Sequence, residues 1–210
     1  DTMMNIVIAG GTGMIGRALT VLLVNEGYSV TVLTRSKSSN PHQSGLKYVN
    51  WGDDNDNWFH AVDGADGIVN LAGENIGSGR WTNDKKKMIL ESRVTAGKYL
   101  TEAVKKANIK PKIFIQSSAI GIYGTSSHNI FTEKSSTGSD YLSGVAKIWE
   151  DSSKPVEDMG IKRAVIRTGV VLDPKEGALA RMLLPFRLFV GGPIGSGRQW
   201  LSWIHLQDEV

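Results

Sequence analysis

The sequence has 210 residues, of which 40% are hydrophobic and 21% are charged, and this composition is typical of a globular protein with one substantial core. The formal net charge of +3 is too small to favour nucleic acid or an anionic membrane as a partner. There is no cysteine, which excludes disulfides, thiolate nucleophiles and zinc–thiolate sites. We expect no metal site, no membrane span and no leader peptide, and a cysteine-free chain fits a reducing, cytoplasmic location.

The first informative stretch begins with strand-favouring residues at positions 6–8 and continues into a cluster of glycines. Gly11, Gly13 and Gly16 match G-x-G-x-x-G, and the apolar spacing of a helix starts at Ile15. The early glycines would let the main chain approach a pyrophosphate, while the last would let the helix pack close to the strand. The N-terminus of that helix would then face the anion. We therefore predict a dinucleotide site, the alternative being a plain glycine turn.

A second predicted strand, residues 29–34, ends at Arg35, which Ser36 and Lys37 follow. In dinucleotide-binding folds an acidic residue at this point accepts hydrogen bonds from the 2′-hydroxyl of NAD, whereas an arginine meets the 2′-phosphate of NADP. No aspartate or glutamate lies between residues 27 and 51. The sequence therefore favours NADP(H) as the cofactor, the alternative being a basic residue in an exposed loop.

Strands and helices alternate along the rest of the chain. The later predicted strands cover residues 47–51, 67–73, 112–118 and 163–167, and the predicted helices cover residues 81–106 and 141–159. This alternation implies an α/β fold with a doubly wound parallel sheet and right-handed crossovers. The fourth strand ends in small residues, Ala72 and Gly73, so a ligand can lie across its carboxyl end, where open α/β sheets bind.

Several short motifs occur together and in order. They are the glycine turn at 10–16, Arg35, the segment 70–76, Arg80-Trp81, Ser92-Arg93, Trp149-Glu150, the segment 167–172 and the stretch 191–205. Together they resemble the atypical "epimerase family protein" branch of the extended short-chain dehydrogenase/reductase superfamily, the NAD(P)-dependent epimerase/dehydratases. The resemblance covers essentially the whole chain and implies an NAD(P)-binding Rossmann fold.

The resemblance also implies where NADP(H) would bind. The implied contacts lie on the glycine turn, at the ends of several strands and on the first long helix: Gly10, Gly11, Thr12, Gly13, Met14, Ile15, Gly16, Thr34, Arg35, Leu71, Ala72, Gly73, Arg93, Ser117 and Val171. We expect these residues to surround one nucleotide site.

The chain departs from the superfamily pattern at the residues that usually transfer protons. Catalytic members have a Tyr-x-x-x-Lys pair on the helix after strand five, in which the lysine lowers the pKa of the tyrosine. Here Tyr141 and Lys147 are six residues apart, about 240° around a helix, so they do not share a face. Ser118 matches the superfamily's serine or threonine after strand five, and Tyr123 matches its Tyr-Gly signature. We take Ser118, Tyr123 and Lys147 as catalytic candidates; for the first two, the alternative is a polar strand end and a packed aromatic.

In the superfamily the carboxyl-terminal part forms a smaller lobe that closes over the substrate. We expect a Rossmann domain at 1–176 and a partial substrate lobe at 177–210, with a short helix whose apolar residues need a partner surface: Leu179, Met182, Leu183, Phe186 and Phe189. The sequence ends at Val210, where a further helix would ordinarily start. We therefore expect an incomplete lobe, an open substrate side and a tendency to self-associate, for instance as a homodimer.

The sequence leaves two functions open. The first is an NADP-dependent epimerase/dehydratase-like or oxidoreductase enzyme acting on a small molecule, in which Ser118 and Tyr123 polarise a carbonyl or hydroxyl. A nucleotide-sugar-like substrate follows from fold analogy alone. The second is an NADPH-binding sensor or regulatory module that keeps the site and has lost turnover, which the missing Tyr-x-x-x-Lys pair favours.

Overall fold

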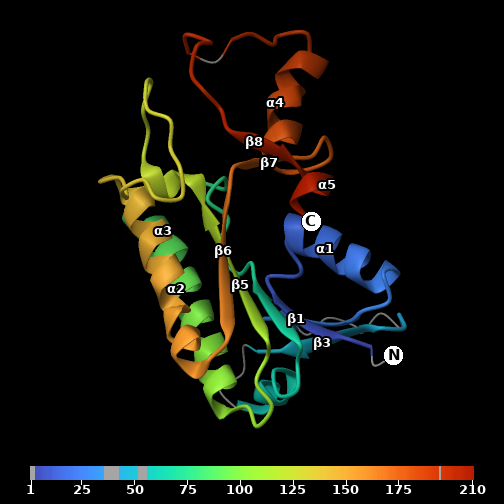
Figure 1. Cartoon of the computed structure of the whole chain (residues 1–210). Helices are drawn as coiled ribbons and strands as arrows, with labels where there is room; N and C mark the ends of the chain where they lie inside the picture. Colours follow the sequence, from blue (N-terminus) through green and yellow to red (C-terminus); the bar gives the residue numbers. More distant parts are fainter. Residues whose placement is uncertain (1–2, 36–42, 52–55, 194) are drawn as a thin grey trace.

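The structure, a computed structural model, describes residues 3–35, 43–51, 56–193 and 195–210. Its centre is a six-stranded parallel sheet with the strand order β3-β2-β1-β4-β5-β6 (Figure 1). The strands are β1 (Asn5–Ala9), β2 (Ser29–Thr34), β3 (Leu46–Asn50), β4 (Gly67–Asn70), β5 (Ile113–Ala119) and β6 (Lys162–Thr168). The order reverses between β1 and β4, as in doubly wound folds, so the predicted fold class is confirmed.

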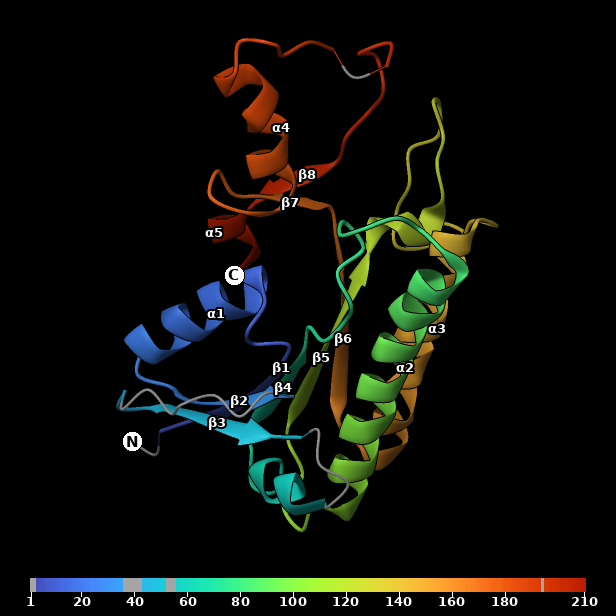
Figure 2. The ribbon, with the colours of Figure 1, turned by 180° about the vertical axis from the view of Figure 1, so that it is seen from behind.

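Helices cover both faces of this sheet. On one face lies α1 (Met14–Asn25), and on the other α2 (Asn83–Lys106) and α3 (Tyr141–Ser152) lie side by side (Figures 1 and 2). Short 3-10 turns connect these elements at η1 (Asp56–Ala61), η2 (Ile120–Tyr123) and η3 (Lys154–Met159). The long helix α2 begins after Thr82, whose side-chain oxygen accepts the N–H of Lys85 at 3.2 Å and so caps the helix.

Side chains that alternate along β1 divide the core between the two faces. Val7 and Ala9 point toward α2, where they pack with Leu100 and Phe114 among fully or nearly fully buried side chains. Ile8 points the other way and packs with β2 residues against the apolar side of α1. Because both faces of the sheet are covered, β1 is apolar at consecutive positions from Ile6 to Ala9, rather than at every second position.

Two predicted boundaries need correction. The predicted helix over 141–159 is wrong in its second half, since α3 ends at Ser152 and residues 154–159 form η3. Pro155 has no backbone N–H to donate and cannot continue α3. The fourth strand ends at Asn70 rather than at residue 73, because the Asn70 side chain accepts the N–H of Ala72 at 3.2 Å and turns the chain.

A smaller part follows β6 and projects beyond the main sheet (Figure 1). The strands β7 (Val170–Leu172) and β8 (Trp203–His205) pair in parallel, so a second sheet joins segments on both sides of the expected boundary at residue 176. The predicted short helix is confirmed as α4 (Gly177–Arg187), but Phe189, which was expected on it, lies beyond its end with φ +59°. The last helix, α5 (Leu206–Glu209), returns to contact α1. Within the described ranges, no helix combines the length and apolarity needed to cross a bilayer.

Candidate functional site

A cleft of about 640 Å³ opens at the carboxyl ends of β1, β2 and β4, beside α2. This is the point where the strand order reverses, and the volume is typical of small-molecule and cofactor sites, about 300–1,000 Å³. The cleft is lined by Gly10, Thr12, Gly13, Leu33, Thr34, Arg35, Trp51, Trp58, Phe59, Leu71, Ala72, Gly73, Glu74, Met88, Glu91, Ser92, Thr95, Ala96 and Tyr99. Many of the expected cofactor contacts therefore lie together on its walls.

The glycine turn between β1 and α1 contains two kinds of glycine. A Cβ at Gly10, where φ is +82°, would lie 2.7 Å from the backbone carbonyl carbon of Leu71, and a Cβ at Gly16 would collide with the Gly10 carbonyl oxygen. The chain's own packing thus requires glycine at both positions. At Gly13 the nearest atom would be 3.4 Å away, an ordinary contact, and φ is −77°. The fold itself does not require glycine there.

Gly13 is also the N-cap of α1, and no side chain of the described residues caps this helix. The first N–H groups of α1, on Met14, Ile15 and Gly16, consequently have no capping side chain over them, and the missing Cβ leaves room for a group to approach. Uncapped N–H groups and the helix dipole together favour an anion. This local geometry fits a phosphate-bearing ligand.

Arg35 stands at the end of β2 with its side chain exposed on the cleft wall. The residue before it, Thr34, is buried, and its carbonyl accepts the N–H of Trp51 at 3.1 Å. The rings of Trp51 and Trp58 meet edge-on with their centroids 5.6 Å apart. An aromatic wall beside an exposed guanidinium suits a ligand that carries both a flat ring and an anionic group. Residues 36 and 37, which follow Arg35, lie outside the described residues.

Arg93 lies beneath the exit of β4. Its guanidinium donates to the carbonyls of Glu74 and Ile89, both at 3.0 Å, and stacks 4.8 Å from the centre of the Trp149 ring. A Cβ at Gly73 would lie 2.9 Å from the guanidinium carbon. Burial lowers the pKa of Arg93, and no carboxylate of the described residues forms an ion pair with it. A half-buried cation that forms no ion pair with a described carboxylate favours an anion at this end of the site.

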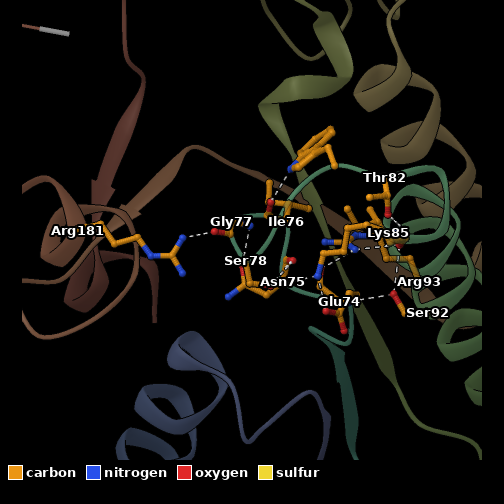
Figure 3. A network of polar contacts seen from close by, with 12 residues as sticks. Glu74, Asn75, Ile76, Gly77, Ser78, Thr82, Lys85, Ser92, Arg93 and Arg181 are labelled. Atoms are coloured by element: carbon orange, nitrogen blue, oxygen red, sulfur yellow. Dashed lines mark hydrogen bonds and ion pairs between the residues drawn. The ribbon is translucent and has the colours of Figure 1, made fainter.

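The loop after β4 is held by polar contacts on two sides (Figure 3). On the α2 side, Lys85 donates to Glu74 Oε1 at 2.6 Å and to Ser78 Oγ at 3.0 Å. On the other side, Arg181 of α4 donates to the carbonyl of Gly77. The loop therefore connects the cleft wall to both α2 and the small C-terminal part.

Ser118 and Tyr123 belong to one partly buried network between β5, α3 and β6. Ser118 is only 3% exposed, and its hydroxyl donates to Glu150 Oε1 at 2.6 Å. Arg167 donates to both carboxylate oxygens of Glu150, at 2.8 and 3.0 Å, and to the Tyr123 hydroxyl at 2.8 Å. Burial opposes ionisation of Glu150, but the hydrogen bonds from Arg167 and Ser118 outweigh it and hold the pKa of Glu150 below its usual value. The same pairing raises the pKa of Arg167.

Tyr141 and Lys147 lie apart from this network and from each other. The Tyr141 hydroxyl donates to the carbonyl of Lys86 at 2.6 Å, and burial raises its pKa. The Lys147 ammonium donates to Asp151 at 2.7 Å along the same helix, and this hydrogen bond raises its pKa. The structure thus brings Ser118 and Tyr123 together but leaves the third candidate, Lys147, on an exposed surface of α3.

Seven of the fifteen expected contacts do not line the cleft: Gly11, Met14, Ile15, Gly16, Arg93, Ser117 and Val171. Ser117 pairs with Ile166 across β5 and β6, and its carbonyl accepts from Gln116 at 2.7 Å. Val171 is buried in β7. The small part lies against the first turns of α1: Arg17 forms an ion pair with Glu176, and a Cβ added at Gly177 would lie 3.1 Å from the Met14 sulfur.

Sequence reasoning missed several residues that the structure places at or near the site. Glu74, Lys85 and Arg181 are far apart in the chain, and no spacing pattern predicts that they meet. Glu150 and Arg167 stood within motifs used for the resemblance, but the motifs do not show that the two pair. The sequence gives only a weak indication of the aromatic cleft wall: two tryptophans, at positions 51 and 58, stand at and after the end of the third predicted strand.

Comparisons with known proteins agree with this geometry. A model of the NAD dependent epimerase/dehydratase family matches residues 6–149. The epimerase family protein YfhF of Bacillus subtilis is 43% identical over 206 residues, which are 98% of this chain and 67% of that protein. The crystal structure of human epimerase family protein SDR39U1 (isoform 2) with NADPH is 37% identical and superposes with a TM-score of 0.86, covering 98% of this chain and 67% of that one.

A more distant relative is the nucleoside-diphosphate sugar epimerase of Corynebacterium glutamicum, 34% identical with a TM-score of 0.79, covering 99% of this chain and 42% of that one. The chain thus spans about two thirds of the length of YfhF and of human SDR39U1, and less of the Corynebacterium protein. The family expected from the motifs is confirmed. This chain belongs to the NAD dependent epimerase/dehydratase family.

Proposed function

We propose that this protein binds NADP(H) in the cleft at the ends of β1, β2 and β4. The observation that carries the proposal is Arg35, an exposed guanidinium on the cleft wall at the position where dinucleotide folds select for the 2′-phosphate. The relative crystallised with NADPH, human SDR39U1, adds support, since it is 37% identical over nearly the whole chain.

Each part of the site has a role in this proposal. The start of α1, opened by Gly13, receives the pyrophosphate, and Arg93 supplies a half-buried positive charge. Arg35 pairs with the 2′-phosphate, and the aromatic wall at Trp51 and Trp58 borders the adenine. When bound, the nicotinamide supplies hydride transfer. The chain's own residues bind it, orient it and exclude water.

We further propose that the bound cofactor serves an epimerase/dehydratase or oxidoreductase reaction on a small molecule. The 34% identity to a nucleoside-diphosphate sugar epimerase favours a nucleotide-sugar-like substrate. We assign the cofactor part to residues 1–176 and part of the substrate side to residues 177–210, although β7 before this boundary pairs with β8 after it. Arg181 joins the substrate side to the cleft wall at Gly77. Exposed apolar residues on α4, such as Leu184 and Phe186, offer a surface for substrate or for a second copy of the chain.

A second candidate function is an NADPH-binding sensor without turnover. The observation that favours it is that the three catalytic candidates already have partners: Ser118 donates to Glu150, Tyr123 accepts from Arg167, and Lys147 donates to Asp151. In this function the cleft binds the cofactor without turnover. NADPH and NADP+ would then differ in how they change the conformation of the protein or its binding to other molecules.

Mass spectrometry of protein purified without added ligand tests the proposal. Retained NADP(H) supports the cofactor assignment, and a second retained molecule identifies the substrate class. Adding sugar nucleotides to the NADPH- or NADP+-loaded protein then separates the two functions. Formation of an epimer, or a change in nicotinamide absorbance, supports the enzyme, whereas neither change across a panel of sugar nucleotides supports the sensor.

A further inference from the structure

Lys85 occupies an unfavourable place for a cation. It lies in the first turn of α2, three residues after the cap Thr82, where the helix dipole favours negative charge. Its side chain is nevertheless only 14% exposed and is held by Glu74 at 2.6 Å and by Ser78 at 3.0 Å (Figure 3). Neither helix propensity nor the helix dipole explains why a largely buried lysine stands at this position. We therefore look for the reason in Glu74, the carboxylate that Lys85 neutralises.

That partner, Glu74, lines the same cleft as Arg35. The hydrogen bond from Lys85 holds the pKa of Glu74 below its usual value against the effect of burial, and the charges of Arg35 and Arg93 act in the same direction. Glu74 is therefore an ionised carboxylate on the wall of a cleft that, in the proposed function, receives phosphate groups. Without a neutralising partner it would repel them and would also weaken the field of Arg35.

We propose that Lys85 is a specificity-determining residue: by neutralising Glu74, it allows the cleft to accept the additional 2′-phosphate beside Arg35 and so favours NADPH over NADH. Lys85 acts through Glu74 and is a positioning residue rather than one that contacts the nucleotide. The inference rests on the proposed function. A purely structural role for the pair, in which it only fastens the loop at 74–78 to α2, predicts equal effects on both nucleotides.

The test replaces Lys85 by methionine, which is unbranched and one atom shorter and removes the charge. Dissociation constants for NADPH and NADH are then measured by fluorescence titration. Lys85→Met should raise the constant for NADPH about tenfold and that for NADH about twofold or less, because NADPH carries the extra phosphate. The double variant Lys85→Met/Glu74→Gln should return NADPH binding to within about twofold of wild type, since it removes the unpaired carboxylate as well.

Two controls sharpen the test. Lys85→Arg keeps the charge and should keep the NADPH-to-NADH ratio. Lys98→Met removes an equal charge from an exposed position on the same helix and should leave both constants unchanged. If Lys85→Met does not fold, Glu74→Gln alone provides the measurement. It leaves Lys85 unneutralised near the cleft and should tighten NADPH about threefold relative to NADH.

An equal loss of both nucleotides in Lys85→Met, or no recovery in the double variant, would overturn the inference and leave NADPH binding itself standing. An unchanged ratio in Glu74→Gln would do the same. If the wild-type protein binds neither nucleotide, the proposed function fails and the inference fails with it, so the two failures are distinguishable.

Discussion

The cleft at the ends of β2 and β4 and the interior between β5, α3 and β6 both gather charged side chains at the carboxyl edge of one sheet. In the cleft, Arg35 is exposed and Arg93 is a half-buried cation. Within the described residues, no side chain caps the start of α1 and no carboxylate forms an ion pair with Arg93. In the interior, Glu150 and Arg167 form a bidentate pair that also includes Ser118 and Tyr123.

The difference separates residues arranged for a ligand from residues arranged for the fold. Groups in the cleft leave donors and positive charge directed at open space, which costs stability in the absence of a partner. Groups in the interior satisfy one another, so their removal leaves a partly buried charge unpaired. Substitutions in the first region should therefore change affinity, and substitutions in the second should change stability.

Glycine substitutions should give the largest contrast, even within one turn. Gly16→Ala forces a Cβ against the Gly10 carbonyl and should lower the free energy of unfolding by about 3 kcal/mol. Gly13→Ala has room within the fold and should cost about 1 kcal/mol or less, yet it should weaken NADPH binding by narrowing the start of α1. Urea denaturation checks the two free energies of unfolding, and cofactor titration checks the loss of NADPH affinity in Gly13→Ala. Similar destabilisation in the two variants would contradict the distinction.

Glu150→Gln should lower the free energy of unfolding by about 2 kcal/mol, because Arg167 then loses its carboxylate in a partly buried place. Gln keeps the volume and can still hydrogen-bond, so the loss reports the charge. Cofactor affinity should change little. A variant as stable as wild type but unable to bind NADPH would reverse the roles assigned to the two regions.

The same residue predicts a dependence of stability on pH. Because the pKa of Glu150 is lowered in the folded state, its contribution to stability is present above the ordinary glutamate value of 4.5 and is lost as the pH falls through the lower, folded value. The difference in stability between wild type and Glu150→Gln should therefore shrink as the pH is lowered below 4.5. Thermal melts of both proteins across this range provide the comparison, and a constant difference would argue against the pairing.

Arg35→Ala should weaken NADPH binding by about 1.5–3 kcal/mol and leave NADH nearly unchanged, because only NADPH carries the phosphate that the guanidinium would pair with. The exposed position of Arg35 implies no loss of thermal stability. Fluorescence titration with both nucleotides decides the matter, and an equal loss for the two would refute the assignment of this residue.

Tyr141→Phe should have the smallest effect. It removes one hydrogen bond to a backbone carbonyl, worth about 1 kcal/mol, and should leave cofactor affinity and any turnover unchanged. Steady-state rates of Tyr141→Phe should be compared with those of Ser118→Ala, which we expect to lower any turnover. Loss of turnover in Tyr141→Phe with intact NADPH binding would show that this tyrosine takes the usual catalytic role after all.

The strands, the glycine turn and the parallel order could be predicted from the sequence because they depend on local patterns. Apolar runs mark buried parallel strands, and glycines at fixed spacing mark the turn. The Glu150–Arg167 pair and the Lys85–Glu74 pair could not be predicted, because which surface residues of a helix meet a loop or strand depends on tertiary packing. In the sequence nothing distinguishes Gly10 and Gly16 from Gly13. Only the distances from an added Cβ to neighbouring atoms show that the fold requires glycine at the first two positions and not at Gly13.

The tryptophans of the cleft wall have a practical consequence. Trp51 and Trp58 are 8% and 3% exposed and line the cleft, whereas Trp200 and Trp203 are 87% and 62% exposed on the small C-terminal part. Indole emission depends on its surroundings, so the buried pair and the exposed pair should contribute at different wavelengths. A nucleotide entering the cleft should quench the short-wavelength emission and leave the long-wavelength emission as an internal reference. The molecule thus carries its own optical reporter of occupancy, and binding can be followed without attaching a label.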